Sequence, residues 1–271
     1  MAHRILAVAL MTFRRLLRSR ILIAGAILAL LVMGLYSGIL IAILAAADQG
    51  DEQGIAALLP MFFHLAVTMF GTVSTMMAVI IGVNVLRTDL TGGTVFGVLS
   101  KPVSRGEYVA GNWLGGLVAV LMLWIVFALA MAAIASGIGS PLGSLHVAII
   151  GSRILVTALS LSAALLLSIR FNPWVAAVLS VLLVNGASVV EQVANILRVL
   201  NVDVPESVVN ALVFPFPITG AFEGLNARLM RSDLAHASVF PAVAHFVDYA
   251  LVLIVLAYLS FRRLDLNRSS E

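Results

Sequence analysis

The sequence predicts an all-α polytopic membrane protein with six transmembrane helices. Of its 271 residues, 62% are hydrophobic and 11% are charged, whereas soluble domains have about 45–50% apolar and about 25% charged residues. The apolar residues form long runs, each of them near or above the roughly 20 residues that a helix needs to cross a bilayer. Lysine and arginine are concentrated in alternate connections between these runs, which is typical of polytopic membrane proteins.

The predicted spans belong to one membrane domain that covers residues 1–271. They comprise residues 21–47, 60–86, 108–136, 145–169, 173–190 and 243–261. The first run has 27 uncharged residues, so we expect this helix to tilt or to protrude. Gly34 and Gly38 within it form a small-xxx-small pair that permits close helix packing. The alternative is that these glycines are simply tolerated in lipid.

Residues 1–20 predict a basic amphipathic helix that lies on the membrane before the first span. They contain five arginines, and Leu6, Leu10, Phe13 and Leu17 fall at helical spacing on one side. A signal peptide would have an apolar run of about 7–15 residues. The run that follows here is far longer, so we favour an interfacial helix.

The positions of the basic residues predict the orientation of the chain. The N-terminal arm, the loop of residues 87–112, the turn at Arg170 and the C-terminal tail all carry lysine or arginine, and the two short opposite connections carry none. Both termini are therefore expected in the cytosol, and the expected location is the cell (plasma or inner) membrane. Residues 191–242 contain four prolines and five acidic residues, so we expect a partly helical segment on the outer side.

The loop of residues 87–112 has an internal pattern that a plain connector does not need. Asp89 and Thr91 can cap a helix, and residues 94–100 can form about two turns with Phe96 and Leu99 among the apolar contacts. Lys101-Pro102 ends that helix, because the residue before proline disfavours the α region. Ser104-Arg105-Gly106-Glu107 is then a capping box that begins the third span. The alternative is an interfacial helix that rests on lipid headgroups.

This loop resembles the first cytosolic loop in the integral-membrane subunits of type-2 ABC exporters. Residues that match this family's pattern are Asp89, Gly93-Thr94, Val98-Leu99, Lys101-Pro102-Val103-Ser104-Arg105 and Glu107-Tyr108. Two positions depart from the pattern, which more often has Glu in place of Asp89 and a Gly-Lys pair where this chain has Gly111-Asn112. The motif covers about 20 residues, and the hydropathy layout of the family covers the whole chain.

The resemblance implies an ABC transporter permease subunit that forms a pathway for ATP-driven export. In that family the N-terminal arm is an elbow helix, and the short helix is the coupling helix that docks on a cytosolic ATPase subunit. The implied coupling residues are Asp89, Thr94, Phe96, Leu99 and Arg105. Spans two and five commonly line the route, which gives the candidate pathway residues Thr68, Thr72, Thr75, Asn185 and Ser188. A second copy or a homologue would complete the dimer.

Most enzymatic chemistry is excluded by residues that the chain lacks. It has no cysteine, and its one lysine, Lys101, stands between Ser100 and Pro102, so a Gly-Lys-Ser/Thr nucleotide site cannot form. We therefore expect no enzyme activity, catalytic residue, cofactor or metal in this chain, and ATP and Mg bound by the partner subunit. A metal site at His236, His245 and Asp248 is a minor alternative.

The charge balance gives no reason to expect nucleic acid as a partner. The net charge of +3 arises mostly from arginines that flank membrane segments, so the expected contacts of these residues are with membrane lipid. Two other functions remain open: a membrane scaffold or assembly factor without transport activity, and an ion-coupled secondary transporter. The latter usually shows inverted repeats or broken helix pairs, and we see neither. The substrate is not specified by any of these patterns.

Arg153 is a charged residue inside the fourth predicted span. A guanidinium at mid-span is costly, by roughly 2.5–3.5 kcal/mol on insertion scales, so we expect a partner. Asp248 and Glu191 lie at similar depth at the outer ends of spans six and five. The prediction is an ion pair of Arg153 with one of them, Asp248 being favoured, and the alternative is that Arg153 reaches the outer interface alone.

Overall fold

The fold is all-helical, as the composition predicts. The computed structural model describes residues 2–47, 52–91, 103–137, 143–200, 202, 205–217 and 240–263, and these residues form helices without a strand. The helices are α1 (Ala2–Leu17), α2 (Arg20–Ala47), α3 (Glu52–Thr91), α5 (Arg105–Gly137), α6 (Ser144–Ser168), α7 (Pro173–Val199), α8 (Glu206–Val213) and α10 (Phe240–Arg262).

Six of the described helices are long and apolar enough to cross a membrane, which confirms the predicted number of spans. They are α2, α3, α5, α6, α7 and α10. The largest differences from the predicted spans are at α3, which begins at Glu52, and at α7, which continues to Val199. The hydrocarbon thickness limits an apolar run but does not end a helix, and no proline or glycine interrupts residues 191–199. The predicted short helix at residues 94–100 lies outside the described residues.

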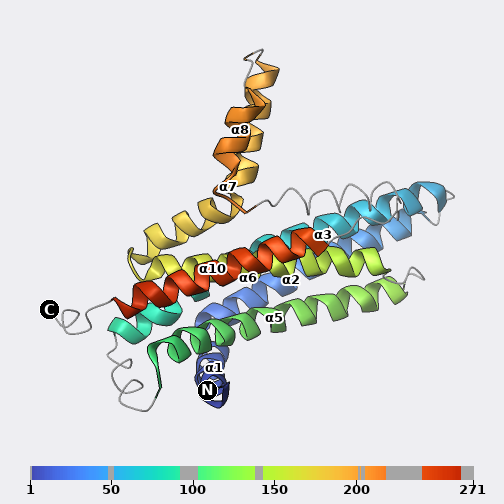
Figure 1. Cartoon of the computed structure of the whole chain (residues 1–271). Coiled ribbons are helices and arrows are strands. Elements are labelled where there is room, and N and C mark those ends of the chain that lie inside the picture. The colour runs from blue at the N-terminus through green and yellow to red at the C-terminus, as the bar shows by residue number, and fades with distance from the viewer. Residues whose placement is uncertain are drawn as a thin grey trace.

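The helices form a bundle from which one arm departs (Figure 1). Helices α2, α3, α5, α6 and α10 run alongside one another, α1 lies across one end, and α7 turns away from the bundle and carries α8 beside its C-terminal half. The end that carries α1 also carries Arg87, Arg105, Arg170 and Arg262, and we call it the arginine-rich end.

Helix α3 is the centre of the bundle and packs against α2, α5, α6 and α7. On its α5 side, the ring of Phe70 stacks on Phe127 with centroids 4.1 Å apart and meets Trp124 edge-on at 4.8 Å. On its α6 side, Gly82 allows the backbones to approach closely. A Cβ at this glycine would lie 2.7 Å from the Cβ of Ala164 and 2.8 Å from the carbonyl oxygen of Leu161.

Within the described residues, Gly34 and Gly38 take no part in close helix packing. A Cβ at either position would meet nothing within 4 Å, so both glycines lie on an open side of α2. Close approach occurs at Gly82, and at Gly111 and Gly115 of α5. The spacing of two glycines shows that helices can approach, but it does not show which helix face has a neighbour.

We predict that Gly82→Ala destabilises the protein, whereas Gly38→Ala does not. The added methyl group at position 82 has no space between α3 and α6, and overpacking of this kind costs about 1–3 kcal/mol. SDS-induced unfolding in mixed micelles measures the difference. The two changes are chemically identical, so equal stabilities for both variants would contradict the packing described at Gly82.

Candidate coupling site at the arginine-rich end

Helix α1 is held tightly against α5 by two glycines. A Cβ at Gly111 would lie 2.6 Å from the Cβ of Val8, and one at Gly115 would lie 2.7 Å from the carbonyl oxygen of Ala9. Val8, Ala9 and Thr12 are buried in this contact. Because glycine has no side chain, the two backbones approach closely enough for side-chain hydrogen bonds to form next to them.

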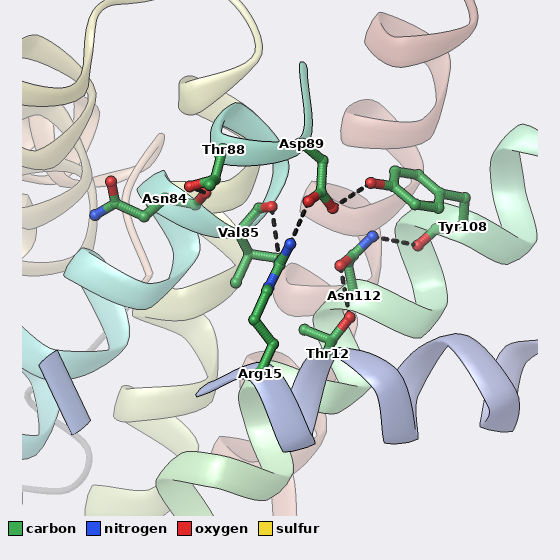
Figure 2. A network of polar contacts seen from close by, with 8 residues as sticks. All are labelled: Thr12, Arg15, Asn84, Val85, Thr88, Asp89, Tyr108 and Asn112. Atoms are coloured by element: carbon green, nitrogen blue, oxygen red, sulfur yellow. Dashed lines mark hydrogen bonds and ion pairs between the residues drawn. The ribbon is translucent and has the colours of Figure 1, made fainter. Parts of the chain in front are cut away.

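A chain of hydrogen bonds continues from this contact into the start of α5 (Figure 2). Thr12 Oγ1 donates to Asn112 Oδ1 at 2.8 Å, and Asn112 Nδ2 donates to the carbonyl oxygen of Tyr108 at 3.0 Å. Thr12, Tyr108 and Asn112 are all buried. Each buried polar side chain here therefore has a partner, which is the condition under which polar groups stabilise an interior.

Asp89 connects this hydrogen-bonded chain to α3. Its side chain is 5% exposed and forms an ion pair with Arg15 of α1 through Oδ1, while the hydroxyl group of Tyr108 donates to Oδ2. Arg15 Nη2 also donates to the carbonyl oxygen of Val85 at 3.2 Å. Both carboxylate oxygens are satisfied, so a buried charge is tolerated. Asp89 thereby joins α1, α3 and α5, as Figure 2 shows.

The predicted capping box at the start of α5 is confirmed. The backbone N–H of Ser104 donates to Glu107 Oε2 at 2.8 Å, and the backbone N–H of Glu107 donates to Ser104 Oγ at 3.2 Å. Arg105 points toward α10, where Nη1 donates to the carbonyl oxygens of Phe261 at 3.4 Å and Arg262 at 2.8 Å. The last carbonyls of a helix have no partner within it and attract cations. Arg105 therefore binds α5 to the end of α10.

A further arginine binds α3 to the turn between α6 and α7. Arg87 Nη1 donates to the carbonyl oxygen of Phe171 at 3.2 Å. In the same turn, Asn172 Oδ1 accepts from the N–H of Val175 at 2.8 Å, and Pro173 occupies the first turn of α7. Asparagine at the N-cap followed by proline is a common way to begin a helix. The end of α3 and the start of α5 are thus bound to α1, α10 and the α6–α7 turn.

The predicted coupling residues divide into two groups. Asp89 and Arg105 lie in this bonded cluster, and Thr94, Phe96 and Leu99 lie outside the described residues. A role in contact with an ATPase stays a prediction for all five. Residues 92–102 connect α3 to α5, so Asp89 and Arg105 lie at the two stems of that loop.

The candidate pathway residues lie on α3 and α7. Thr72 is exposed, and Thr68, Thr75, Asn185 and Ser188 are half-buried. Thr72 Oγ1 donates to the carbonyl oxygen of Thr68 at 3.0 Å, and Asn185 Nδ2 donates to the carbonyl oxygen of Val181 at 2.9 Å. These two side chains bond to their own helices, which lets polar groups face lipid or water at little cost. Their role in a pathway stays a prediction.

Arg153 lies against α3. Its Nη2 is 3.4 Å from Thr68 Oγ1, and Gly71 leaves room for the aliphatic part of the side chain. Asp248 is on an exposed side of α10, and Glu191 is half-buried on α7. The sequence does not indicate the contact with Thr68, because the expected partner of a guanidinium group inside a span is a carboxylate. The ion pair with Asp248 or Glu191 stays a prediction.

Sequence reasoning also missed most partners of Asp89. Arg15 was counted only as one of several basic residues, and Tyr108 only as part of a family pattern. Arg15 and Tyr108 are separated from Asp89 by 74 and 19 residues. One local signal was present in Gly111 and Gly115, which form a small-xxx-small pair at the start of a span.

We predict that Asp89→Ala destabilises the protein by about 1–3 kcal/mol, because it leaves Tyr108 and Arg15 without their acceptor. Arg15→Ala on that background adds little, so a double-mutant cycle gives a coupling of about 0.5–3 kcal/mol. SDS-induced unfolding in neutral micelles measures both. Arg170→Ala removes an exposed arginine at the same end and is the control. Strict additivity of Arg15→Ala and Asp89→Ala would contradict the pairing.

Comparison with known proteins gives a family that agrees with the helical membrane fold. No curated protein matches the chain. A family described as ABC-2 family transporter protein matches residues 6–266. That match includes all six membrane-spanning helices, the stems of the loop between α3 and α5, and most of α1. The chain therefore belongs to the ABC-2 transporter family, as a multi-pass membrane component of such a transporter.

Proposed function

We propose that this chain is the permease subunit of an ATP-driven exporter and that a separate cytosolic ATPase subunit drives it. Membership of the ABC-2 family supports the proposal, as does the lack of a nucleotide-binding motif around Lys101. In this proposal ATP and Mg are bound by the ATPase, and this chain supplies the membrane pathway together with a second copy or a homologue.

The observation that carries the proposal is the bonding of the loop stems at the arginine-rich end. The stem residues Asp89 and Arg105 are bonded to α1 and to the end of α10, and Asp89 also accepts a hydrogen bond from Tyr108. A force applied to residues 92–102 therefore acts on several helices together. A loop that serves as a passive connector needs no such bonding on both sides.

In the proposed mechanism, ATP binding closes the two ATPase subunits and moves the loops that rest on them. Phe96 and Leu99 make the apolar contact, and Asp89 and Arg105 pass the movement to α1, α3, α5 and α10. These helices then switch the pathway between inward and outward access. Thr68, Thr72, Thr75, Asn185 and Ser188 line the route on α3 and α7 in this proposal.

We predict that Phe96→Asp and Leu99→Asp uncouple the ATPase from transport. A carboxylate introduced at an apolar contact would lose water without gaining a partner. This weakens the contact by several kcal/mol or prevents it from forming. Transport and co-purification of the ATPase in mild detergent are both expected to fall, while membrane insertion persists. Ser100→Asp, at the end of the same segment, is the control.

Full transport and complete assembly in both apolar-to-Asp variants would show that this loop is not the coupling element. If no ATPase co-purifies with the unaltered chain, the proposed function is wrong and the scaffold or secondary-transporter alternatives take its place.

The proposal also fixes the orientation of the chain. We predict that residues 101 and 268 lie in the cytosol, and that residue 50 and residues 203–233 lie outside. The chain has no cysteine, so single engineered cysteines can be labelled with an impermeant thiol reagent in intact cells. A cysteine at position 50 is expected to be labelled in intact cells. A cysteine at position 101 is expected to be labelled only after the cells are lysed. Labelling of position 101 in intact cells would reverse the topology.

A further inference from the structure

Helix α1 has three distinct faces, and within the described residues one of them packs against the rest of the chain. Val8, Thr12 and Leu16, at successive intervals of four residues, are buried against the rest of the protein. Leu6, Leu10 and Leu17 form a second face that is exposed. Met11 and Arg14, at an interval of three residues, form a third exposed face, which is followed by the exposed Arg18 in the turn after α1. Residues at this spacing lie one above another on a helix.

The second face is apolar and has no cover within the described residues. Leu6 is 63% exposed and Leu10 is 49% exposed. The bend at Arg18 and Ser19 leads directly into α2, which begins at Arg20 and crosses the membrane. Helix α1 is therefore placed at the boundary of the bilayer, where an exposed leucine stripe is covered by acyl chains.

The third face is basic and lacks acidic neighbours on its own segment. Residues 1–47 contain five arginines and no Asp or Glu. In the described part of the chain, the salt bridge of α1 is made by Arg15, which points to Asp89. Arg15 is half-buried, whereas Arg14 and Arg18 are exposed. Their guanidinium groups are thus available to an external anion, next to the leucine stripe.

We propose that α1 binds the headgroups of anionic phospholipids through Arg14 and Arg18 while its leucine stripe enters the acyl region. Guanidinium groups bind phosphate oxygens in a bidentate manner, and an anionic leaflet attracts each basic residue near its surface. The adjoining leucine stripe favours lipid over a protein partner, because a partner that took the arginines alone would leave the leucines exposed to water.

This lipid site is connected to the loop stems by the helix itself. Arg14 and Arg15 are neighbours, and Arg15 is bonded to Asp89 and to the carbonyl oxygen of Val85. Lipid bound at Arg14 and Arg18 therefore fixes the helix that holds the end of α3. The proposal concerns lipid binding alone and does not depend on an ATPase partner.

The test uses the purified full-length chain in mixed micelles that contain phosphatidylglycerol and phosphatidylcholine. Native mass spectrometry measures how much of each lipid is retained. We expect selective retention of phosphatidylglycerol, and a loss of roughly 25-fold in its affinity in the Arg14→Gln/Arg18→Gln variant, at about fivefold for each arginine near an anionic surface. The Arg14→Lys/Arg18→Lys variant is expected to bind with an affinity between those of the unaltered chain and the Gln variant, because lysine keeps the charge but cannot bind phosphate in a bidentate manner.

The matched control is the Arg170→Gln/Arg263→Gln variant, which removes two exposed arginines from the same end of the bundle. It is expected to retain phosphatidylglycerol like the unaltered chain. Equal losses in the two Gln variants would overturn the proposal in favour of unspecific attraction to the membrane. Unchanged binding in the Arg14→Gln/Arg18→Gln variant would also overturn it.

If the Arg14→Gln/Arg18→Gln variant fails to fold, the single variants Arg14→Gln and Arg18→Gln replace it, with about a fivefold loss expected in each. A spin label at Leu10→Cys provides a second measurement that needs no change of charge. Its oxygen accessibility is expected to rise when phosphatidylglycerol is added, as the leucine stripe enters the acyl region. A label that stays in water in both lipid mixtures contradicts the proposal.

Discussion

The buried carboxylate of Asp89 is the constraint on which the arginine-rich end depends. A carboxylate removed from water is strongly destabilising unless its oxygens are bonded to a cation and to hydrogen-bond donors. Arg15 and Tyr108 supply these partners from two other helices. The end of α3 is consequently in place only when α1 and the start of α5 are also in place. Three segments that are distant in sequence thus form one mechanical unit.

Small residues make this unit possible inside a membrane. Hydrophobic burial drives helix association weakly in lipid, because acyl chains are as apolar as leucine, so close packing and hydrogen bonds have to contribute. Gly111 and Gly115 let α1 approach α5, which brings Thr12 within 2.8 Å of Asn112. Gly82 has the same effect between α3 and α6. Where no neighbour is present, as at Gly34, a glycine in the same pattern leaves the helix face open.

The sequence predicted the features that depend on local chemistry. Apolar run length predicted six spans, and Ser104 with Glu107 predicted the capping box, because each signal lies within a few neighbouring residues. The partners of Asp89 could not be predicted in this way, since helix-to-helix contacts depend on rotation and tilt, which a single sequence does not encode locally. The same limit explains Arg153, whose observed contact is the hydroxyl group of Thr68. Periodicity identified the leucine stripe of α1 but not the face that packs on α5.

The basic residues that predict orientation fall into two groups, one bonded within the protein and one exposed. Arg15, Arg87 and Arg105 are bonded to a carboxylate or to backbone carbonyl oxygens of other segments, so they are part of the folded structure. Arg14, Arg18, Arg170 and Arg263 are exposed. A count of arginines treats the two groups alike, although replacing a member of the first breaks contacts between helices and replacing a member of the second leaves those contacts in place. Arg14 and Arg15 show the distinction most directly, because they are neighbours in the chain and yet Arg15 is paired with Asp89 while Arg14 is exposed.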